Sequence, residues 1–149
     1  MADRLNSYGV SVSSLIANDR YFPLGAETVL SEFMVNDWPD ENAFNRIISS
    51  LITKARGKNR RKIRAFGEMV AILWAQGNFG ATVNLEHLWN KFATKEAFCL
   101  FCAYPKVGFT EPLSDSIGHI CSAHSKMIDG ASPQLAEIIY RETVHKPAI

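Results

Sequence analysis

The stretch Ile63-Arg64-Ala65-Phe66-Gly67-Glu68-Met69 decides the fold that we expect, together with Phe98-Cys99-Leu100-Phe101-Cys102-Ala103-Tyr104-Pro105. Each reads as a short buried strand that ends in polar or turn-forming residues. In an open α/β sheet, ligands gather beside such strand ends. We therefore look for function where these two strands end.

Amphipathic helices are expected around the two strands. Apolar residues recur at helical spacing from Ala26 to Met34, and again from Phe44 to Ala55, where Asp40 can cap the helix. Further helices are expected over 69–76 and around 85–92, and a short strand over 20–24. This alternation of helix and strand predicts an α/β fold, with a mainly parallel sheet flanked by helices.

Two more helices are expected towards the C-terminus. Ser114 and Asp115 can cap the first, and Ser132-Pro133 can begin the second. Their apolar faces would carry Ile117, Ile120, Cys121, His124 and Ile128 in the first helix, and Leu135, Ile138 and Ile139 in the second. Because no repeat or long linker divides the 149 residues, we expect a single domain over residues 1–149.

Composition restricts the classes of partner. The chain has 16 Lys and Arg against 15 Asp and Glu, so no overall field attracts nucleic acid or an anionic membrane. Seven basic residues between Lys54 and Arg64 could grip phosphates, but without interleaved aromatic residues a solvated turn is favoured over a nucleic-acid site. The three cysteines favour a reducing compartment, and no apolar run suits a signal peptide or membrane helix. We expect a cytoplasmic protein without membrane contact.

Cys99-x-x-Cys102 and Cys121-x-x-His124 have the spacing of a four-ligand zinc site. Residues three apart in a strand point to opposite faces, however, so Cys99 and Cys102 are not expected to share a metal. Cys121 fits the apolar stripe of its helix as a small hydrophobic residue. These observations favour a chain without a metal ion or another cofactor.

Four other residues are candidates for ligand contact, each with a structural alternative. Glu68 could accept hydrogen bonds or act as a base, or it could cap the helix that follows. His124 could contact a ligand or be a hydrogen-bonded core residue, and Tyr104 could offer its hydroxyl or close the sheet edge. Trp74 reads first as a core residue.

Enzymatic activity is not expected. The chain lacks the pattern G-x-x-x-x-G-K-[ST] of a phosphate-binding loop and the pattern G-x-S-x-G of a nucleophile elbow. An ATPase-like enzyme would need phosphate-gripping residues that the sequence does not contain.

An ordered series of motifs resembles the MEDS family, the sensory domain of methanogen and methylotroph regulators typified by the repressor DcmR. The motifs are AETVLSEFM (26–34), FGEMV (66–70), LWAQGN (73–78), LEHLWN (85–90), LFCAYP (100–105) and ICSAH (120–124). The resemblance covers about residues 21–128, which leaves 129–149 as a helical extension. Compared with the family, the chain looks as if it lacks an N-terminal βαβ portion.

The resemblance implies a fold similar to RecA and KaiC without a working phosphate loop. It also implies a domain that senses small hydrocarbon-like molecules and signals to a histidine kinase, an anti-sigma module or a DNA-binding region.

We therefore expect a non-enzymatic sensory or regulatory domain that binds a small, mostly apolar molecule near the two strand ends. Glu68, Cys102, Tyr104 and His124 would orient the ligand, and Trp74 would form an apolar wall. The alternative is an interaction module that pairs with a second copy or a signalling partner and binds no small ligand.

Overall fold

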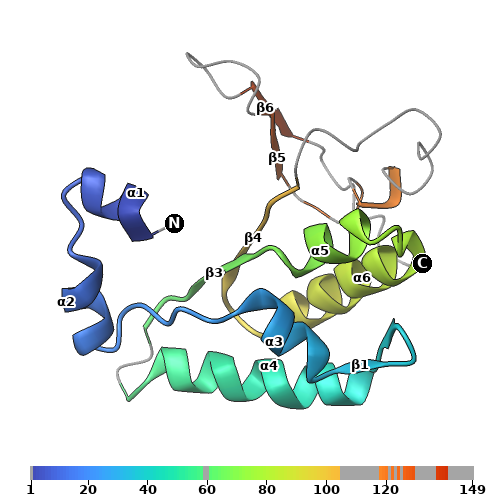
Figure 1. Ribbon diagram of the computed structural model, residues 1–149, viewed down its shortest axis with the longest axis horizontal. Coiled ribbons are helices and arrows are strands. Elements are labelled where there is room, and N and C mark those ends of the chain that lie inside the picture. Colours follow the sequence, from blue (N-terminus) through green and yellow to red (C-terminus); the bar gives the residue numbers. More distant parts are fainter. Residues whose placement is uncertain are drawn as a thin grey trace, which may run out of the picture.

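The computed structural model describes residues 2–58, 61–104, 118–120, 122, 124, 126–129 and 137–140 (Figure 1). Two short helices come first, α1 (Ala2–Ser7) and α2 (Val12–Ala17). The main helices are α3 (Ala26–Ser31), α4 (Glu41–Arg56), α5 (Met69–Ala75) and α6 (Phe79–Lys95). The helices expected from the sequence between residues 26 and 95 are thus confirmed, although α3 ends earlier than its apolar pattern suggested. Within the described ranges, no helix is long and apolar enough to cross a bilayer.

Local sequence explains the boundaries of these helices. Asp40 caps α4 as expected, because its Oδ1 accepts a hydrogen bond of 2.7 Å from the backbone N–H of Ala43. Gly57 ends α4 with a φ of +56°, in the left-handed region that glycine tolerates. Asn78 caps α6 in the same way as Asp40 caps α4.

A tight hairpin separates α3 from α4. It pairs β1 (Met34–Val35) with β2 (Trp38–Pro39) in antiparallel orientation. The two residues between them, Asn36 and Asp37, have φ values of +50° and +60°, as a two-residue turn of type I′ requires. This turn chemistry ends the helical pattern before the expected Met34.

The prediction of a mainly parallel sheet flanked by helices is wrong. The described part of the chain contains three separate two-stranded sheets, of which one is parallel: β3 (Arg64–Gly67) beside β4 (Cys99–Cys102). The second is the β1–β2 hairpin, and the third pairs β5 (Lys126–Asp129) with β6 (Glu137–Tyr140) in antiparallel orientation. These pairs do not form a RecA-like sheet.

Three expected elements differ in the structure. Residues 20–24 form no strand, and Pro23 has no N–H to donate to a ladder. Towards the C-terminus, residues 118–120 are helical as expected, but the helix does not continue to Ile128, which lies in β5. Ile138 and Ile139 lie in β6 instead of the final helix that their spacing predicted. Short apolar runs fit either period, so periodicity alone could not decide.

The β3–β4 pair is buried on one face only. Its register places Ala65 beside Leu100 and Phe66 beside Phe101. Burial alternates along both strands, so Phe66 and Phe101 are exposed while Ala65 and Leu100 are half-buried. The two exposed phenyl rings stack with their centroids 5.8 Å apart. The expectation of two buried strands is therefore wrong for their outer face, although the two strands do lie side by side.

The core lies among the helices. Phe44 of α4 is fully buried, and its ring makes edge-to-face contacts with Phe33, Trp89 and Phe92 at centroid distances of 5.3, 5.0 and 6.0 Å. Helix α5 packs between α3 and α6, and α4 packs against α6. Side chains of the inner face of β4, including Leu100 and Cys102, pack against this core. The inner face of β4 is thereby brought towards α6.

Candidate functional site

The candidate site is built around a buried acid, Glu86 of α6. Its residue exposure is 3%, which is rare for a carboxylate that lacks partners. It lies one helical turn after Thr82, another buried polar residue, whose hydroxyl donates to the backbone oxygen of Asn78 at 2.9 Å. Thr82 is thus satisfied within its own helix, whereas Glu86 takes its partners from other segments.

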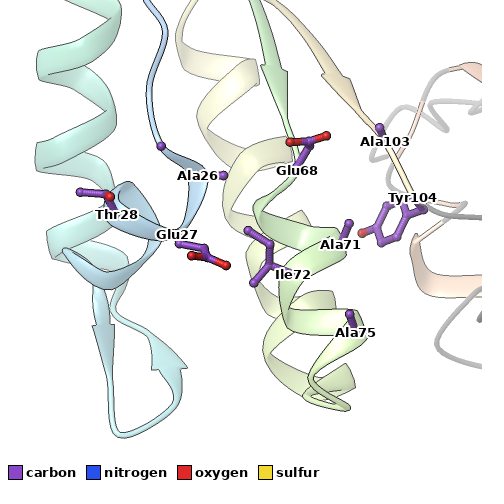
Figure 2. A pocket seen from close by; sticks show the side chains of 10 residues that line it. Ala26, Glu27, Thr28, Glu68, Ala71, Ile72, Ala75, Ala103 and Tyr104 are labelled. Carbon is purple, nitrogen blue, oxygen red and sulfur yellow. The ribbon is translucent and has the colours of Figure 1, made fainter. Parts of the chain in front are cut away.

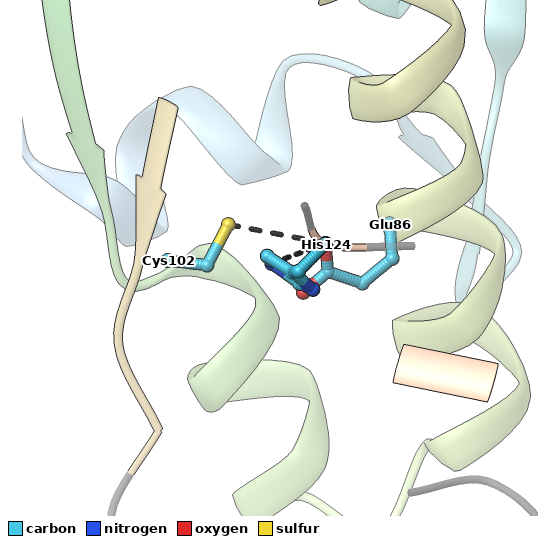
Figure 3. A group of neighbouring side chains, drawn as sticks. All are labelled: Glu86, Cys102 and His124. Atoms are coloured by element: carbon cyan, nitrogen blue, oxygen red, sulfur yellow. Dashed lines mark hydrogen bonds and ion pairs between the residues drawn. The ribbon is translucent and has the colours of Figure 1, made fainter. Parts of the chain in front are cut away.

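Three side chains meet the two oxygens of Glu86, and Figure 3 draws two of them, Cys102 and His124. The Tyr104 hydroxyl donates to Oε1 at 2.5 Å. On the other oxygen, Oε2, the Cys102 thiol donates at 3.8 Å and the His124 Nε2 lies at 3.5 Å. Cys102 comes from β4, Tyr104 follows that strand, and His124 follows the helical residues 118–120. Segments far apart in the chain therefore converge on one carboxyl group.

Burial governs the electrostatics of this cluster. It raises the pKa of Glu86 above its usual 4.5, and the charge of His124 and the hydrogen bonds from Tyr104 and Cys102 oppose that rise. Burial, with the negative charge of Glu86, raises the pKa of the Cys102 thiol to about 12. Without a cation, Cys102 therefore stays a thiol at neutral pH.

The ring of His124 is held by a second contact. Its Nδ1 lies 2.7 Å from the backbone oxygen of Ile120, a distance at which Nδ1 carries the proton and donates it. In the neutral ring, Nε2 then presents a lone pair towards Glu86. A proton or a metal ion between Nε2 and the carboxylate would make this approach favourable.

An open groove of about 760 Å³ lies next to the cluster (Figure 2). It runs between the start of α3, one side of α5 and the segment after β4. Its lining consists of Gly25, Ala26, Glu27, Thr28, Glu68, Ala71, Ile72, Ala75, Ala103 and Tyr104. Tyr104 belongs to both places, because its side chain lines the groove and its hydroxyl reaches Glu86.

The structure brings together three of the five residues expected to bind ligand: Cys102, Tyr104 and His124. Trp74 is buried, and its ring lies edge-to-face with that of Tyr104 at a centroid distance of 6.3 Å. Glu68 lines the groove and is not one of the three side chains at the Glu86 carboxyl group (Figure 2). Whether these five residues contact a ligand stays a prediction.

The alternative role expected for Glu68 is to cap the helix that follows it, α5. Glu68 occupies the N-cap position of α5, but its side chain makes no capping hydrogen bond. The carboxylate is instead exposed at the edge of the groove. Glu68 is therefore placed to meet a molecule in the groove without first breaking a cap.

The four-residue zinc pattern is not assembled as its spacing would require. Cys99 is exposed on the outer face of β4, whereas Cys102 is half-buried on the inner face. Cys121 lies outside the described residues. The group that could hold a metal ion is a different one: ligand atoms of Glu86, Cys102 and His124 all lie within 4.8 Å of one another.

Sequence reasoning missed Glu86, although a signal was present. The buried stripe of α6 includes Thr82, Leu85 and Trp89. At 100° per residue, Glu86 falls at the edge of that stripe, on the side of Thr82 and Trp89. A carboxylate at such a position needs partners, and this need could have identified the site.

The basic run between Lys54 and Arg64 makes structural contacts. Arg56 forms an ion pair of 3.0 Å with Glu96, and Arg61 donates to the backbone oxygen of Asp19 at 2.6 Å. The ammonium of Lys54 lies 5.7 Å from the centre of the Phe22 ring. Three basic side chains of this run therefore have partners within the fold.

Comparison with known proteins gives the family. No curated protein and no solved structure matches the chain. The family model described as the methanogen/methylotroph DcmR sensory domain matches residues 2–125, which is most of the chain and extends the resemblance towards the N-terminus. The match includes Glu86, the groove and the described residues of the cluster. The chain therefore belongs to the MEDS family of sensory domains.

Proposed function

We propose that this sensory domain is non-enzymatic and binds a small, mostly apolar molecule in the groove between α3, α5 and the segment after β4. The sensory role is that of the family. The observation that carries the ligand class is the groove's lining, in which small apolar side chains predominate. The signal would pass to a partner such as a histidine kinase or another regulator, and a cytoplasmic location remains a prediction.

The composition of the groove supports an apolar ligand. Ala26, Ala71, Ala75 and Ala103 leave space along its walls, and Ile72 adds a larger apolar surface. A volume of about 760 Å³ falls within the range of about 300–1,000 Å³ that small-molecule sites occupy. The groove is open, so a short hydrocarbon or halogenated compound would fill only part of it.

Two polar groups would orient the molecule. Glu68 stands at the groove's edge as an acceptor, and the Tyr104 hydroxyl lies where the groove meets the Glu86 cluster. Cys102 and His124 meet the same carboxyl group as Tyr104, and the Trp74 ring contacts the Tyr104 ring. These three residues would act on the ligand indirectly, by holding the Tyr104 side chain in position. We propose direct ligand contact for Glu68 and Tyr104 first.

Thermal shift with a panel of halogenated and short-chain organic compounds tests this proposal. A compound present at 100 times its Kd should add about 2.7 kcal/mol to the stability of the folded chain. Ala75→Phe should abolish the shift by filling the groove, and Glu68→Gln should reduce it. The matched control, Ala17→Phe, changes an exposed alanine of α2 and should leave the shift intact.

Two results would contradict the proposal. One is a panel in which no compound stabilises the wild-type chain, and the other is an undiminished shift in Ala75→Phe. Turnover of a nucleotide by the purified chain would contradict its non-enzymatic part.

A second candidate function is association through the exposed face of the β3–β4 pair. Phe66 and Phe101 are 44% and 50% exposed there, and their rings stack on each other. Together they form an exposed apolar patch, and such patches can mark protein–protein contacts. Light scattering tests this candidate on the full chain. A dimer that becomes a monomer in Phe66→Ser/Phe101→Ser, but not in Tyr8→Ser, would favour it. A wild-type monomer that binds a compound would reject it.

A further inference from the structure

We propose that Glu86, Cys102 and His124 form a binding site for a divalent transition-metal ion of the zinc class. The three side chains supply one carboxylate oxygen, one sulfur and one imidazole nitrogen from three separate segments (Figure 3). This site goes beyond the proposed groove ligand and uses none of the groove's apolar residues.

The distances from Oε2 of Glu86 to the other two ligand atoms fit a tetrahedral ion. With usual Zn–S, Zn–N and Zn–O bond lengths and tetrahedral angles, sulfur and oxygen should lie about 3.6 Å apart, and nitrogen and oxygen about 3.4 Å apart. The observed distances to the shared Oε2 of Glu86 are 3.8 Å from the Cys102 Sγ and 3.5 Å from the His124 Nε2. Two of the three pairs of ligand atoms therefore lie at nearly tetrahedral spacing, and the third pair, Cys102 Sγ and His124 Nε2, lies within 4.8 Å.

The residues that hold these ligands also fit a metal site. Ligating histidines almost always donate their other ring N–H to a carboxylate, a backbone carbonyl or water, and His124 Nδ1 lies 2.7 Å from the carbonyl oxygen of Ile120. Tyr104 occupies Oε1 of Glu86 and thereby leaves Oε2 for the ion. Tyr104 is thus a positioning residue for the metal.

The chemistry of the donors selects the metal class. A thiolate and an imidazole suit zinc and its neighbours and do not suit Mg²⁺ or Ca²⁺, which take oxygen ligands. Three protein ligands leave a fourth position open to water or a small molecule. Binding must release the thiol proton of Cys102 to the solvent, so the charge of the ion replaces that proton beside Glu86.

The site differs from the one that cysteine spacing alone would predict. The spacing pattern needs Cys99, which lies exposed on the outer face of β4, and it has no use for Glu86. The structural site needs Glu86 and has no use for Cys99. Two substitutions therefore distinguish the two arrangements.

Cobalt titration of the full chain tests the proposal. The wild-type chain should bind one Co²⁺ and develop the near-ultraviolet charge-transfer band of a thiolate bound to cobalt, which Zn²⁺ then displaces. Cys102→Ser should lose the band. His124→Ala and Glu86→Gln should weaken the affinity, measured against a competing chelator, by at least about 10-fold. Tyr104→Phe should weaken it by about 10- to 100-fold while keeping the band.

Matched controls are available for each ligand. Cys99→Ser lies on the same strand, His119→Ala precedes His124 on an exposed helical position, and His87→Ala is the exposed neighbour of Glu86. All three should keep the band and the affinity. Circular dichroism on every variant separates loss of the site from loss of the fold.

Three outcomes would overturn the proposal. The first is the absence of a thiolate band in the wild-type chain. The second is loss of the band in Cys99→Ser with normal binding in Glu86→Gln, which would restore the spacing pattern. The third is normal affinity in both His124→Ala and Glu86→Gln. None of these results depends on an apolar ligand, so the groove proposal stands or fails separately.

Discussion

The Tyr104 hydroxyl donates a hydrogen bond of 2.5 Å to Oε1 of Glu86, and this contact joins the surface groove to the buried acid. The donor follows β4 and the acceptor lies on α6, so the bond also ties the parallel strand pair to the helical core. Glu86 is nearly inaccessible to water, which means that any change in its partners is felt as a change in stability.

Replacing Tyr104 by Phe should destabilise the fold. The substitution keeps the ring near Trp74 but removes the donor to Oε1, which water cannot easily replace at this depth. Leaving a buried acceptor unsatisfied costs about 1–3 kcal/mol. Urea denaturation measures the change in the free energy of unfolding. The control Tyr8→Phe alters a tyrosine that is 76% exposed and should leave that free energy unchanged; equal effects of the two substitutions would contradict the role of the bond.

Glu86→Gln should change how stability depends on pH in chelator-treated protein. The folded state raises the pKa of Glu86 above 4.5, so the folded chain binds this proton more tightly than the unfolded chain does. The contribution of Glu86 to the free energy of unfolding is therefore fully present below pH 4.5. It is lost as pH rises through the raised pKa of Glu86 in the folded state. The positive charge of His124 opposes this loss.

Urea midpoints measured from pH 4 upwards test the sign. Relative to Glu86→Gln, the wild-type chain should lose stability as pH rises across that window. The exposed Glu32 gives a matched control, since Glu32→Gln should keep the wild-type profile. A steeper fall in Glu86→Gln than in the wild type would reverse the assigned direction.

The two described cysteines should react at very different rates in chelator-treated protein. Cys99 is exposed, whereas Cys102 is half-buried and its thiol has a pKa of about 12. Because the thiolate is the nucleophile, iodoacetamide at pH 8 should alkylate Cys102 at least about 100-fold more slowly than Cys99. Peptide mass spectrometry follows each residue separately. Comparable rates would show that Cys102 is not held in the environment described above.

Phe44→Ala should be among the most damaging substitutions in the core. The ring is fully buried and touches three other aromatic rings, so its removal leaves a cavity and should cost about 3–5 kcal/mol. Thermal or urea unfolding measures this loss. Phe101→Ala, at a half-exposed ring that stacks on Phe66, should cost no more than about 1.5 kcal/mol.

The sequence predicted local structure better than it predicted assembly. Asp40 and the stripe that includes Phe44 located α4, because a cap and a long helical period are local signals. The apolar runs that begin at Ile63 and Phe98 also located β3 and β4. The prediction of a larger sheet was wrong. Strands of four residues carry too little periodicity to distinguish a half-buried pair from the middle of a wide sheet.

The residues of the candidate site were likewise predicted only in part, because sequence patterns are local and the site depends on tertiary packing. Cys102, Tyr104 and His124 could be associated with strand ends and with a helix face, which sequence patterns reveal. The acid that joins them could not be chosen from pattern alone, because Glu68 stands at a strand end, where ligands are expected, whereas Glu86 lies within a helical stripe. Only the tertiary packing of α6 against the segment after β4 decides between the two carboxylates.

A hydroxyl has one proton and can give it to one acceptor at a time. Any guest that accepts a hydrogen bond from Tyr104 would divert this donor from Glu86, whose Oε1 would then need another donor. Binding of the guest and protonation of Glu86 would thus be coupled. Each would change the affinity of the protein for the other, guest or proton, by the same factor. A single phenol would then convert the arrival of a molecule into an electrostatic change inside the protein.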